Sequence, residues 1–223
     1  MQKTFVRAMP AALALALALA LLALAGAAAA QEPPDTTPGA RRASIHLLPS
    51  LGSSGFTVLG QHAQGNYATL TRAPVLGLAA ELRTPVRFID LRGSVLHSRP
   101  VLRPDDEDFT TRSRTSVTLL TLDAVVRAPR VLDVRPYLVA GGGVKHYDFD
   151  QEELGAAGDD PFARDYTAPV FHLGAGLEWD VGRYGLYVES GIYTGEFKLE
   201  STRFTSYGQT EWPLTFGLRI PIR

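Results

Sequence analysis

Apolar residues alternate with polar or small ones through most of the chain after Arg42, and this period of two predicts β-strands. Turn-forming residues separate the alternating stretches. None of these stretches has the apolar face of an amphipathic helix. In the last stretch every second residue from Trp212 to Ile222 is apolar. Eight strands are predicted in all, at roughly 43–52, 69–82, 86–98, 114–127, 134–147, 167–180, 184–198 and 209–222.

The connections between these predicted strands alternate strictly between short and long. The short ones contain Pro85, Pro129 and Gly182, whereas the long ones are polar and cover 53–68, 99–113, 148–166 and 199–208. An outer-membrane barrel has this arrangement, with tight periplasmic turns and long extracellular loops. It also places both ends of the barrel on the periplasmic side. We therefore predict an all-β fold over 43–223: an eight-stranded antiparallel up-and-down transmembrane β-barrel.

A soluble barrel of the lipocalin kind is the alternative, with its apolar face turned inward. Strand length favours a membrane barrel over a soluble one, because several predicted strands exceed the roughly 9–11 residues that cross a bilayer obliquely. Aromatic residues also gather towards the two ends of the strands, as in the girdles of membrane barrels. The predicted periplasmic girdle is Trp179, Tyr184 and Tyr187, and the predicted outer girdle is Tyr147, Tyr166, Phe171, Tyr193, Phe197, Tyr207 and Trp212.

The N-terminus has the three parts of a secretory signal peptide. It opens with two basic residues, continues through an Ala/Leu stretch at 11–25, and reaches a small-residue cleavage site at Ala28-Ala29-Ala30. We predict a cleaved signal peptide over 1–30 and a flexible, Pro-rich periplasmic lead-in over 31–42. An uncleaved anchor is the alternative, but the apolar run is short for a span. The chain has no Cys, which excludes a lipoprotein anchor.

Charge narrows the range of partners. The net charge of the chain is −1, and loss of the two basic residues of the signal peptide makes it −3. This balance argues against binding to nucleic acid. The expected partners are outer-membrane lipid, including lipopolysaccharide, and the barrel assembly machinery during insertion. A monomer is favoured.

Two of the predicted strands resemble those of a known family. Residues 135–144 (RPYLVAGGGV) resemble the RPY-x-x-x-G-x-G strand of small outer-membrane β-barrel proteins, and 171–178 (FHLGAGLE) resemble the G-x-G-x-E strand that follows it. The resemblance covers roughly 43–223 and is to the broad outer-membrane β-barrel domain family, which includes the barrel of outer membrane protein A. It implies an architecture rather than an activity. The chain departs from the family at its end: many members finish on an aromatic residue that the assembly machinery reads, whereas this chain finishes on Ile222 and Arg223.

Charged residues of both signs share the predicted inward face. The interior of an eight-stranded barrel is just wide enough for side chains to fill. Pairing of these charges therefore predicts a rigid plug, with a narrow ion or solute path as the alternative. The predicted lumen network consists of Glu81, Arg83, Asp90, Arg92, Asp123, Arg127, Glu178, Asp180, Glu189 and Arg219.

No residue pattern indicates a catalytic, cofactor or metal site. The glycine run 141–143 lacks the Lys-Ser/Thr and the helix of a phosphate-binding loop, so it predicts close packing or a bulge. His97 and Ser98 are adjacent on a strand and point to opposite faces, so His97 cannot readily activate Ser98. His172 is expected to be a hydrogen-bonded interior residue. The acidic stretches within 105–108 and 148–160 predict solvated loops, with a divalent cation as the alternative.

These observations predict a non-enzymatic outer-membrane protein of a Gram-negative envelope. Its role is expected to be structural, envelope-stabilising or surface-interacting, with a mostly plugged lumen. A small pore or hydrophobic-solute conduit is the second possibility. An envelope lipid-modifying enzyme, either an acyl hydrolase or an acyltransferase, is the third.

Overall fold

The computed structural model describes residues 44–62, 67–84, 89–104, 113–131, 133–150, 165–196, 204–206 and 208–222. The predicted signal peptide and lead-in lie outside the described residues, as do Phe197, Tyr207 and the acidic stretches at 105–108 and 151–160. Within the described part, no helix has the length and apolar character needed to cross a bilayer.

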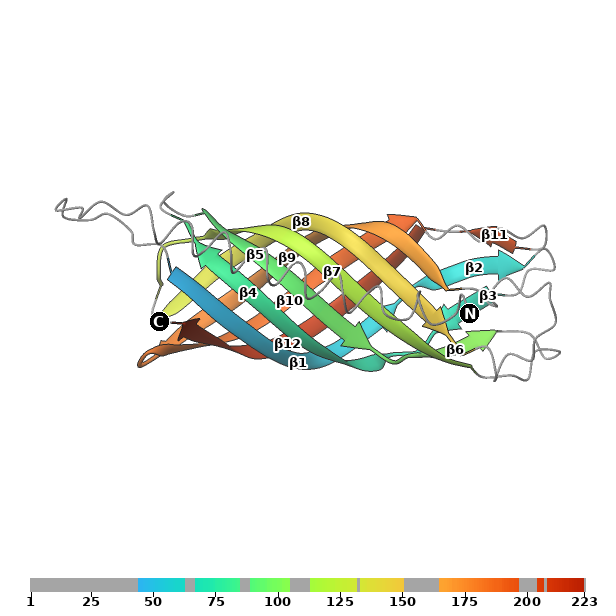
Figure 1. Cartoon of the computed structure of the whole chain (residues 1–223), viewed down its shortest axis with the longest axis horizontal. Helices are drawn as coiled ribbons and strands as arrows, with labels where there is room; N and C mark the ends of the chain where they lie inside the picture. Colours follow the sequence, from blue (N-terminus) through green and yellow to red (C-terminus); the bar gives the residue numbers. More distant parts are fainter. Residues whose placement is uncertain are drawn as a thin grey trace, which may run out of the picture.

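Eight long antiparallel strands form a closed barrel (Figure 1). Each strand pairs with the next along the chain, and β12 pairs with β1 to close the ring. The predicted eight-stranded up-and-down architecture is thereby confirmed. The strands are β1 (Ser44–Phe56), β4 (Ala73–Arg83), β5 (Ile89–Ser98), β7 (Ser113–Arg127), β8 (Val134–Phe149), β9 (Tyr166–Val181), β10 (Tyr184–Glu196) and β12 (Gly208–Ile222).

Four short strands continue the barrel wall at one end, which we call the loop end (Figure 1). They are β2 (Val58–His62), β3 (Tyr67–Leu70), β6 (Val101–Pro104) and β11 (Phe204–Ser206). They pair in the order β11-β2-β3-β6, and β6 pairs with β7. The sequence predicts loops over nearly all of these residues, and the structure corrects this. We call the opposite end the turn end, because the short connections after β4, β7 and β9 lie there, as do the start of β1 and the finish of β12.

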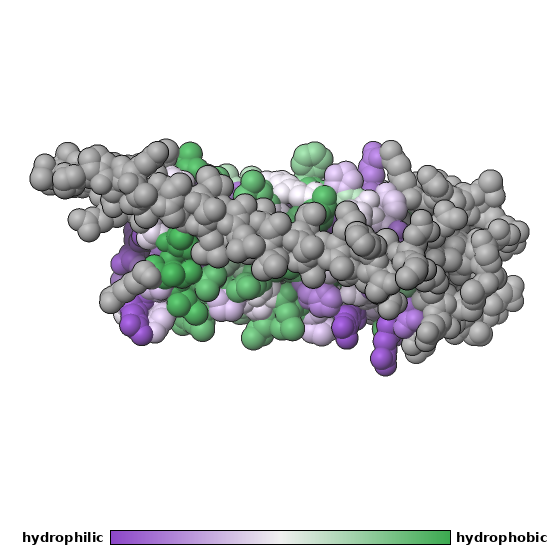
Figure 2. Space-filling model, viewed as in Figure 1, coloured by the Kyte–Doolittle hydropathy of each residue, from purple (hydrophilic) through white to green (hydrophobic). Residues whose placement is uncertain are grey.

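The outer surface of the barrel is an apolar band. Phe171 is 74% exposed and Phe216 53% exposed, whereas Thr215 and Arg219, at intervening positions of β12, are buried. Figure 2 shows hydrophobic residues over the middle of the visible face and hydrophilic ones towards its two ends. Every barrel strand contributes to the band, through Leu51, Leu76, Leu78, Leu91, Leu122, Leu138, Phe171, Leu173, Leu186, Leu214 and Phe216. A continuous apolar surface of this kind, between polar ends, is the lipid-facing surface of a transmembrane barrel.

Two strands whose alternation is ambiguous in the sequence acquire a clear orientation. His46 and Leu48 of β1 are buried on either side of the exposed Leu47. On β8, Tyr137 and Val139 are buried on either side of the exposed Leu138. Small and aromatic residues blur the apolar–polar alternation on both strands. On β8 the inward face also carries apolar side chains, so its two faces look alike in the sequence.

The glycine run at the centre of β8 allows β7 and β8 to approach closely. A Cβ atom on Gly141 would lie 2.3 Å from the backbone oxygen of Leu122, and one on Gly143 would lie 1.8 Å from that of Leu120. The β7–β8 pairing continues through these residues without a register shift, so the run is close-packed strand and not a bulge.

Candidate functional site: the barrel lumen

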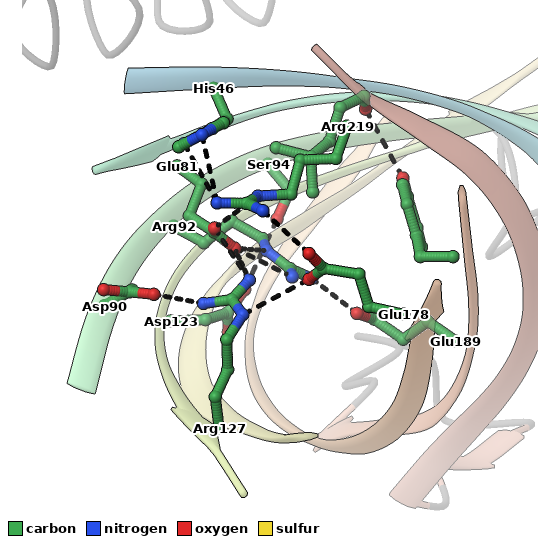
Figure 3. Close-up of polar contacts among 12 residues, drawn as sticks. His46, Glu81, Asp90, Arg92, Ser94, Asp123, Arg127, Glu178, Glu189 and Arg219 are labelled. Carbon is green, nitrogen blue, oxygen red and sulfur yellow. Dashed lines mark hydrogen bonds and ion pairs between the residues drawn. The ribbon is translucent and has the colours of Figure 1, made fainter. Parts of the chain in front are cut away.

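A cluster of ion pairs fills the turn end of the lumen (Figure 3). Within the cluster, Glu81 of β4 lies directly opposite Arg92 of β5 in the strand register. Six of the barrel strands contribute a charged side chain. The cluster consists of Arg92, Arg127 and Arg219 with Glu81, Asp90, Glu178 and Glu189.

Arg127 lies at the centre of this cluster. Its Nη2 atom donates to both carboxylate oxygens of Glu81 at 2.7 Å, and its Nε donates to Glu178 Oε2 at 3.3 Å. Its Nη1 atom donates to Asp90. Glu81 also accepts a hydrogen bond from Arg92 Nη2 at 3.1 Å. Buried charges persist in a protein interior only when partners of this kind offset the loss of water.

Arg219 extends the cluster towards β1. Its Nη1 atom donates to Glu178 Oε1 at 2.7 Å, and its Nη2 atom lies 3.0 Å from Nε2 of His46 (Figure 3). On the other side of the cluster, Arg92 Nη1 donates to Glu189. The arginines therefore connect β1, β4, β5, β7, β9, β10 and β12 across the lumen.

A second group of polar side chains lies in the middle of the lumen. His172 Nδ1 donates to Asp123 Oδ1 at 3.0 Å, and the His172 ring stacks on Tyr193 with ring centroids 4.0 Å apart. Asp123 also accepts hydrogen bonds from Thr121 at 2.8 Å and from Ser94 at 3.3 Å. The hydroxyls of Thr121 and Ser94 therefore bond to the carboxylate of Asp123 and not to the imidazole of His172. A serine or threonine nucleophile would have to hydrogen-bond to the imidazole that activates it.

A third group closes the loop end of the lumen. Lys145 Nζ lies 2.6 Å from Glu211 Oε2 and donates to Gln209 Oε1 at 3.0 Å. Ser54 donates to the other oxygen of Glu211 at 2.6 Å, and the Lys145 ammonium lies 5.1 Å from the ring centre of Phe56. An apolar cluster of the loop end packs around this group; its buried members are Leu59, Ala68, Leu70, Leu102, Val117, Tyr147 and Phe149.

The free space between these groups includes one small cavity. A cavity of about 20 Å³ lies beside Arg92, His172, Tyr187 and Thr215. This volume holds roughly one water molecule. Within the described residues, side chains of the three groups occupy the lumen at the turn end, in the middle and at the loop end.

The structure places most of the predicted lumen charges inside the barrel. Seven belong to the cluster at the turn end, and Asp123 pairs with His172 in the middle. Arg83 is half-buried at the turn end, where it lies opposite Asp90 in the strand register. Asp180 is the correction: it lies at the rim, where it pairs with Arg130 and lies 3.9 Å from Arg135. It is one of the last residues of β9, beyond the filled part of the lumen.

Several lumen residues are missing from the sequence prediction. His46 and Lys145 lie on the two strands with ambiguous alternation. Gln209 and Glu211 occupy odd-numbered positions of the last strand, as Arg219 does, and therefore face inward. This parity in the sequence is enough to predict both as lumen residues. Ser54 lies near the end of β1, in a stretch predicted to be a loop.

The structure places some of the predicted girdle residues on the outer face and others inside the barrel. Phe171, Tyr184 and Trp212 are exposed on the outer face, and Trp179 lies on the same face of β9 as Phe171. The correction concerns Tyr147, Tyr187 and Tyr193, which are buried inside the barrel, and Tyr166, which packs against the apolar cluster of the loop end. Proximity to a strand end does not determine the face of the sheet; parity along the strand does.

Glycines create the space for the inward tyrosines. Tyr137 lies opposite Gly176, and a Cβ atom there would be 2.2 Å from the tyrosine ring. Tyr187 lies opposite Gly217, and a Cβ atom there would be 2.5 Å from the tyrosine hydroxyl. An aromatic ring over a glycine of the neighbouring strand also fixes the register of the pair.

The described residues contain no group of three or more His, Cys, Asp or Glu side chains arranged to hold a metal ion. The lumen holds the ion-pair cluster at the turn end, hydrogen-bonded polar groups in the middle, and the apolar cluster of the loop end, which we call the apolar cap.

The barrel is similar to small outer-membrane proteins of known structure. Neisserial surface protein A aligns with a TM-score of 0.52 at 14% identity, over 81% of this chain and 99% of that one. Ail, the attachment invasion locus protein of Yersinia pestis, gives a TM-score of 0.45 at 14% identity, over 79% and 99%. OprG of Pseudomonas aeruginosa gives 0.46 at 10% identity, over 81% and 96%. No protein-family model and no curated protein matches the chain. The barrel topology and the likeness to Neisserial surface protein A show that the chain has the fold of a small eight-stranded outer-membrane β-barrel.

Proposed function

We propose that this protein is a non-conducting barrel of the outer membrane that stabilises the envelope or presents an interaction surface at its loop end. The observation that carries the proposal is the filled lumen. A barrel whose interior is occupied by the ion-pair cluster, the His172–Asp123 pair and the apolar cap offers no continuous path for water or solutes. Its remaining accessible parts are the lipid-facing band and the two ends.

The orientation follows from the two ends of the barrel. Short turns and both termini of the barrel lie at the turn end, which corresponds to the periplasmic side of outer-membrane barrels, and the loop end faces outward. The signal peptide predicted over 1–30 would deliver the chain to the periplasm. The assembly machinery would then insert it, with outer-membrane lipid and lipopolysaccharide around the apolar band. The fold shared with Neisserial surface protein A supports this placement.

The placement of the candidate nucleophiles supports a non-enzymatic role. Ser98 is buried on the inward face, whereas His97 lies on the outward face, where its Nδ1 atom is 3.1 Å from the hydroxyl of Thr118. His172 is buried with Asp123 inside the filled lumen, where a lipid substrate has no access.

Planar-bilayer recording of the refolded barrel tests the proposal. We expect insertion of the protein, verified by a heat-dependent shift of its gel mobility, without discrete current steps. Reproducible, long-lived ohmic steps from the heat-modifiable species would overturn the proposal and assign a pore.

A further inference from the structure

A groove of about 650 Å³ crosses the outer face of the barrel near the turn end. Its lining includes Val126, Pro129, Leu138, Ala175, Ser190 and Leu214. These residues come from β7 and the turn after it, and from β8, β9, β10 and β12. Most of the lining residues face outward, so the groove lies in the apolar band; Arg127, Tyr137 and Gly176 also line it from inward-facing positions.

The groove follows one register row across the strands. Val126 lies opposite Leu138, Leu138 opposite Ala175, Ala175 opposite Ser190, and Ser190 opposite Leu214. The two smallest side chains of this row, Ala175 and Ser190, are adjacent, with a leucine on each side. They form the floor of the groove, and the larger side chains form its walls.

The dimensions of the groove suit one hydrocarbon chain. Four strand intervals of about 4.8 Å give the row a length of about 19 Å. The strands of a membrane barrel tilt by about 35–45°, so a row across them rises obliquely from the rim. One leaflet contributes roughly half of the about 30 Å of hydrocarbon. The groove thus extends from the turn-end rim, at Pro129, through most of one leaflet.

The rim beside the groove carries charges of both signs. Arg130 and Asp133 belong to the turn that follows Pro129. Arg130 pairs with Asp180, and Arg135 lies 3.9 Å from the same carboxylate. Arg135 and Asp180 have the inward parity of their strands, so Arg130 and Asp133, in the turn next to the groove residue Pro129, are the charges on the groove side. Together they complement a headgroup that has both a phosphate and a primary ammonium. Arginine binds phosphate through paired N–H donors, and an ammonium donates to carboxylates.

We propose that the groove and this charged rim bind one phospholipid with a phosphoethanolamine headgroup, from the leaflet at the turn end. Its acyl chain lies across β8, β9 and β10 over Ala175 and Ser190. Its phosphate contacts Arg130, and its ammonium contacts Asp133. A choline headgroup has no N–H to donate, so it binds less well. The inference rests on the proposed insertion of the barrel into a membrane.

The two tryptophans of the chain provide a reporter and an internal control. Trp179 lies on the outward face of β9, two residues after the groove residue Leu177, and Trp212 is exposed towards the loop end of β12. The W212F variant therefore reports on lipid at the groove, and W179F reports on lipid elsewhere. Both are reconstituted in phosphatidylethanolamine–phosphatidylcholine vesicles in which one lipid or the other has brominated chains that quench tryptophan.

For Trp179 we expect quenching to show about a two- to fivefold preference for phosphatidylethanolamine, the size that a few exposed ion pairs supply. Trp212 should show no preference. In the W212F background, R130Q and the groove-filling A175L should each abolish the preference at Trp179. The matched control A80L, which enlarges a small outward residue of β4 away from the groove, should leave it unchanged.

Three results would overturn the inference while leaving membrane insertion intact. One is quenching of both tryptophans with the same lipid preference. Another is a preference at Trp179 that survives both R130Q and A175L. The third is a loss of lipid quenching at Trp179 alone, which would indicate that a second protein copy covers the groove. Absence of quenching at both tryptophans would contradict the proposed function itself.

Discussion

Arg127 bonds to three carboxylates that are themselves buried, those of Glu81, Asp90 and Glu178. Removal of its guanidinium leaves these charges without their shared partner. We expect R127M to lower the free energy of unfolding by about 3–5 kcal/mol, the cost of breaking a buried ion pair from one side. Urea unfolding in lipid vesicles measures this change.

R183M is the matched control for this substitution. Arg183 is exposed in the turn between β9 and β10, so its loss should change the free energy of unfolding by less than about 0.5 kcal/mol. The additional substitution E81Q in R127M should cost less than it does in the wild type, because the two residues share one network. Equal, small effects of R127M and R183M would contradict the account of the charge cluster.

Gly143 is the position of the described chain where the β7–β8 approach leaves least room for a side chain. A Cβ atom there would lie 1.8 Å from the Leu120 backbone oxygen, which no side-chain rotation can relieve. We expect G143A to destabilise the barrel by about 1–3 kcal/mol through overpacking. G55A is the control, since its Cβ would meet nothing closer than 3.9 Å. Equal unfolding midpoints for the two variants would refute the close-approach explanation.

At this scale, the sequence predicts which face a charge occupies but not which partner it has. On β4, β5 and β7 strict parity puts Glu81, Arg92 and Arg127 inside. The contact of Arg127 with Asp90 depends on the stagger of β5 and β7, which sets the position of each residue along the barrel axis. No local sequence pattern encodes this stagger. His46 and Lys145 escape prediction because their strands mix small, aromatic and apolar residues on both faces.

At the scale of the element, β12 shows how one strand serves two environments. Phe216 lies near the middle of the strand on its outward face, and Ile222 is its last residue. If lipid covers this face, F216R should destabilise the barrel by about 2–4 kcal/mol in bilayers, whereas I222R near the interface should cost about 0–1 kcal/mol. Urea unfolding in vesicles measures both values. A soluble barrel would tolerate arginine at both exposed positions equally.

Element boundaries were predictable where alternation is long and ends at a turn residue. Gly182 between β9 and β10 is such a case: it has a positive φ of 62°, which glycine adopts without strain. The short strands β2, β3, β6 and β11 were not predictable, because three to five residues are too few to show a period of two. Their pairing depends on strands that the barrel has already aligned, as with Thr69 and Arg103 across β3 and β6.

At the scale of the whole molecule, the alternation of the strands has two consequences that depend on each other. The outward set forms the apolar band, which suits a membrane. The inward set forms three successive groups in the lumen, and the proposed closure of the barrel to water rests on them. Strand count, topology and the separation of the two faces follow from the sequence. The apolar cap at the loop end does not, since it requires strands within segments that look like loops.

The measurement that tests this account most directly uses the absence of cysteine from the chain. Single cysteines are placed at two adjacent positions in the middle of β7: Thr121, which is 3% exposed and faces the lumen, and Leu122, which is 51% exposed and faces outward. A third, at Ala128 in the turn after β7, is the accessible control. Each variant is incorporated into lipid nanodiscs, which leave both ends of the barrel open to water, and treated with a charged maleimide.

We predict rapid labelling of A128C, and labelling of T121C and L122C only after unfolding, because the plug protects one and lipid protects the other. Rapid labelling of T121C in the folded barrel would mean that the lumen is open to water. Rapid labelling of L122C would mean that the apolar band does not face lipid. Either result would contradict a closed, membrane-spanning barrel.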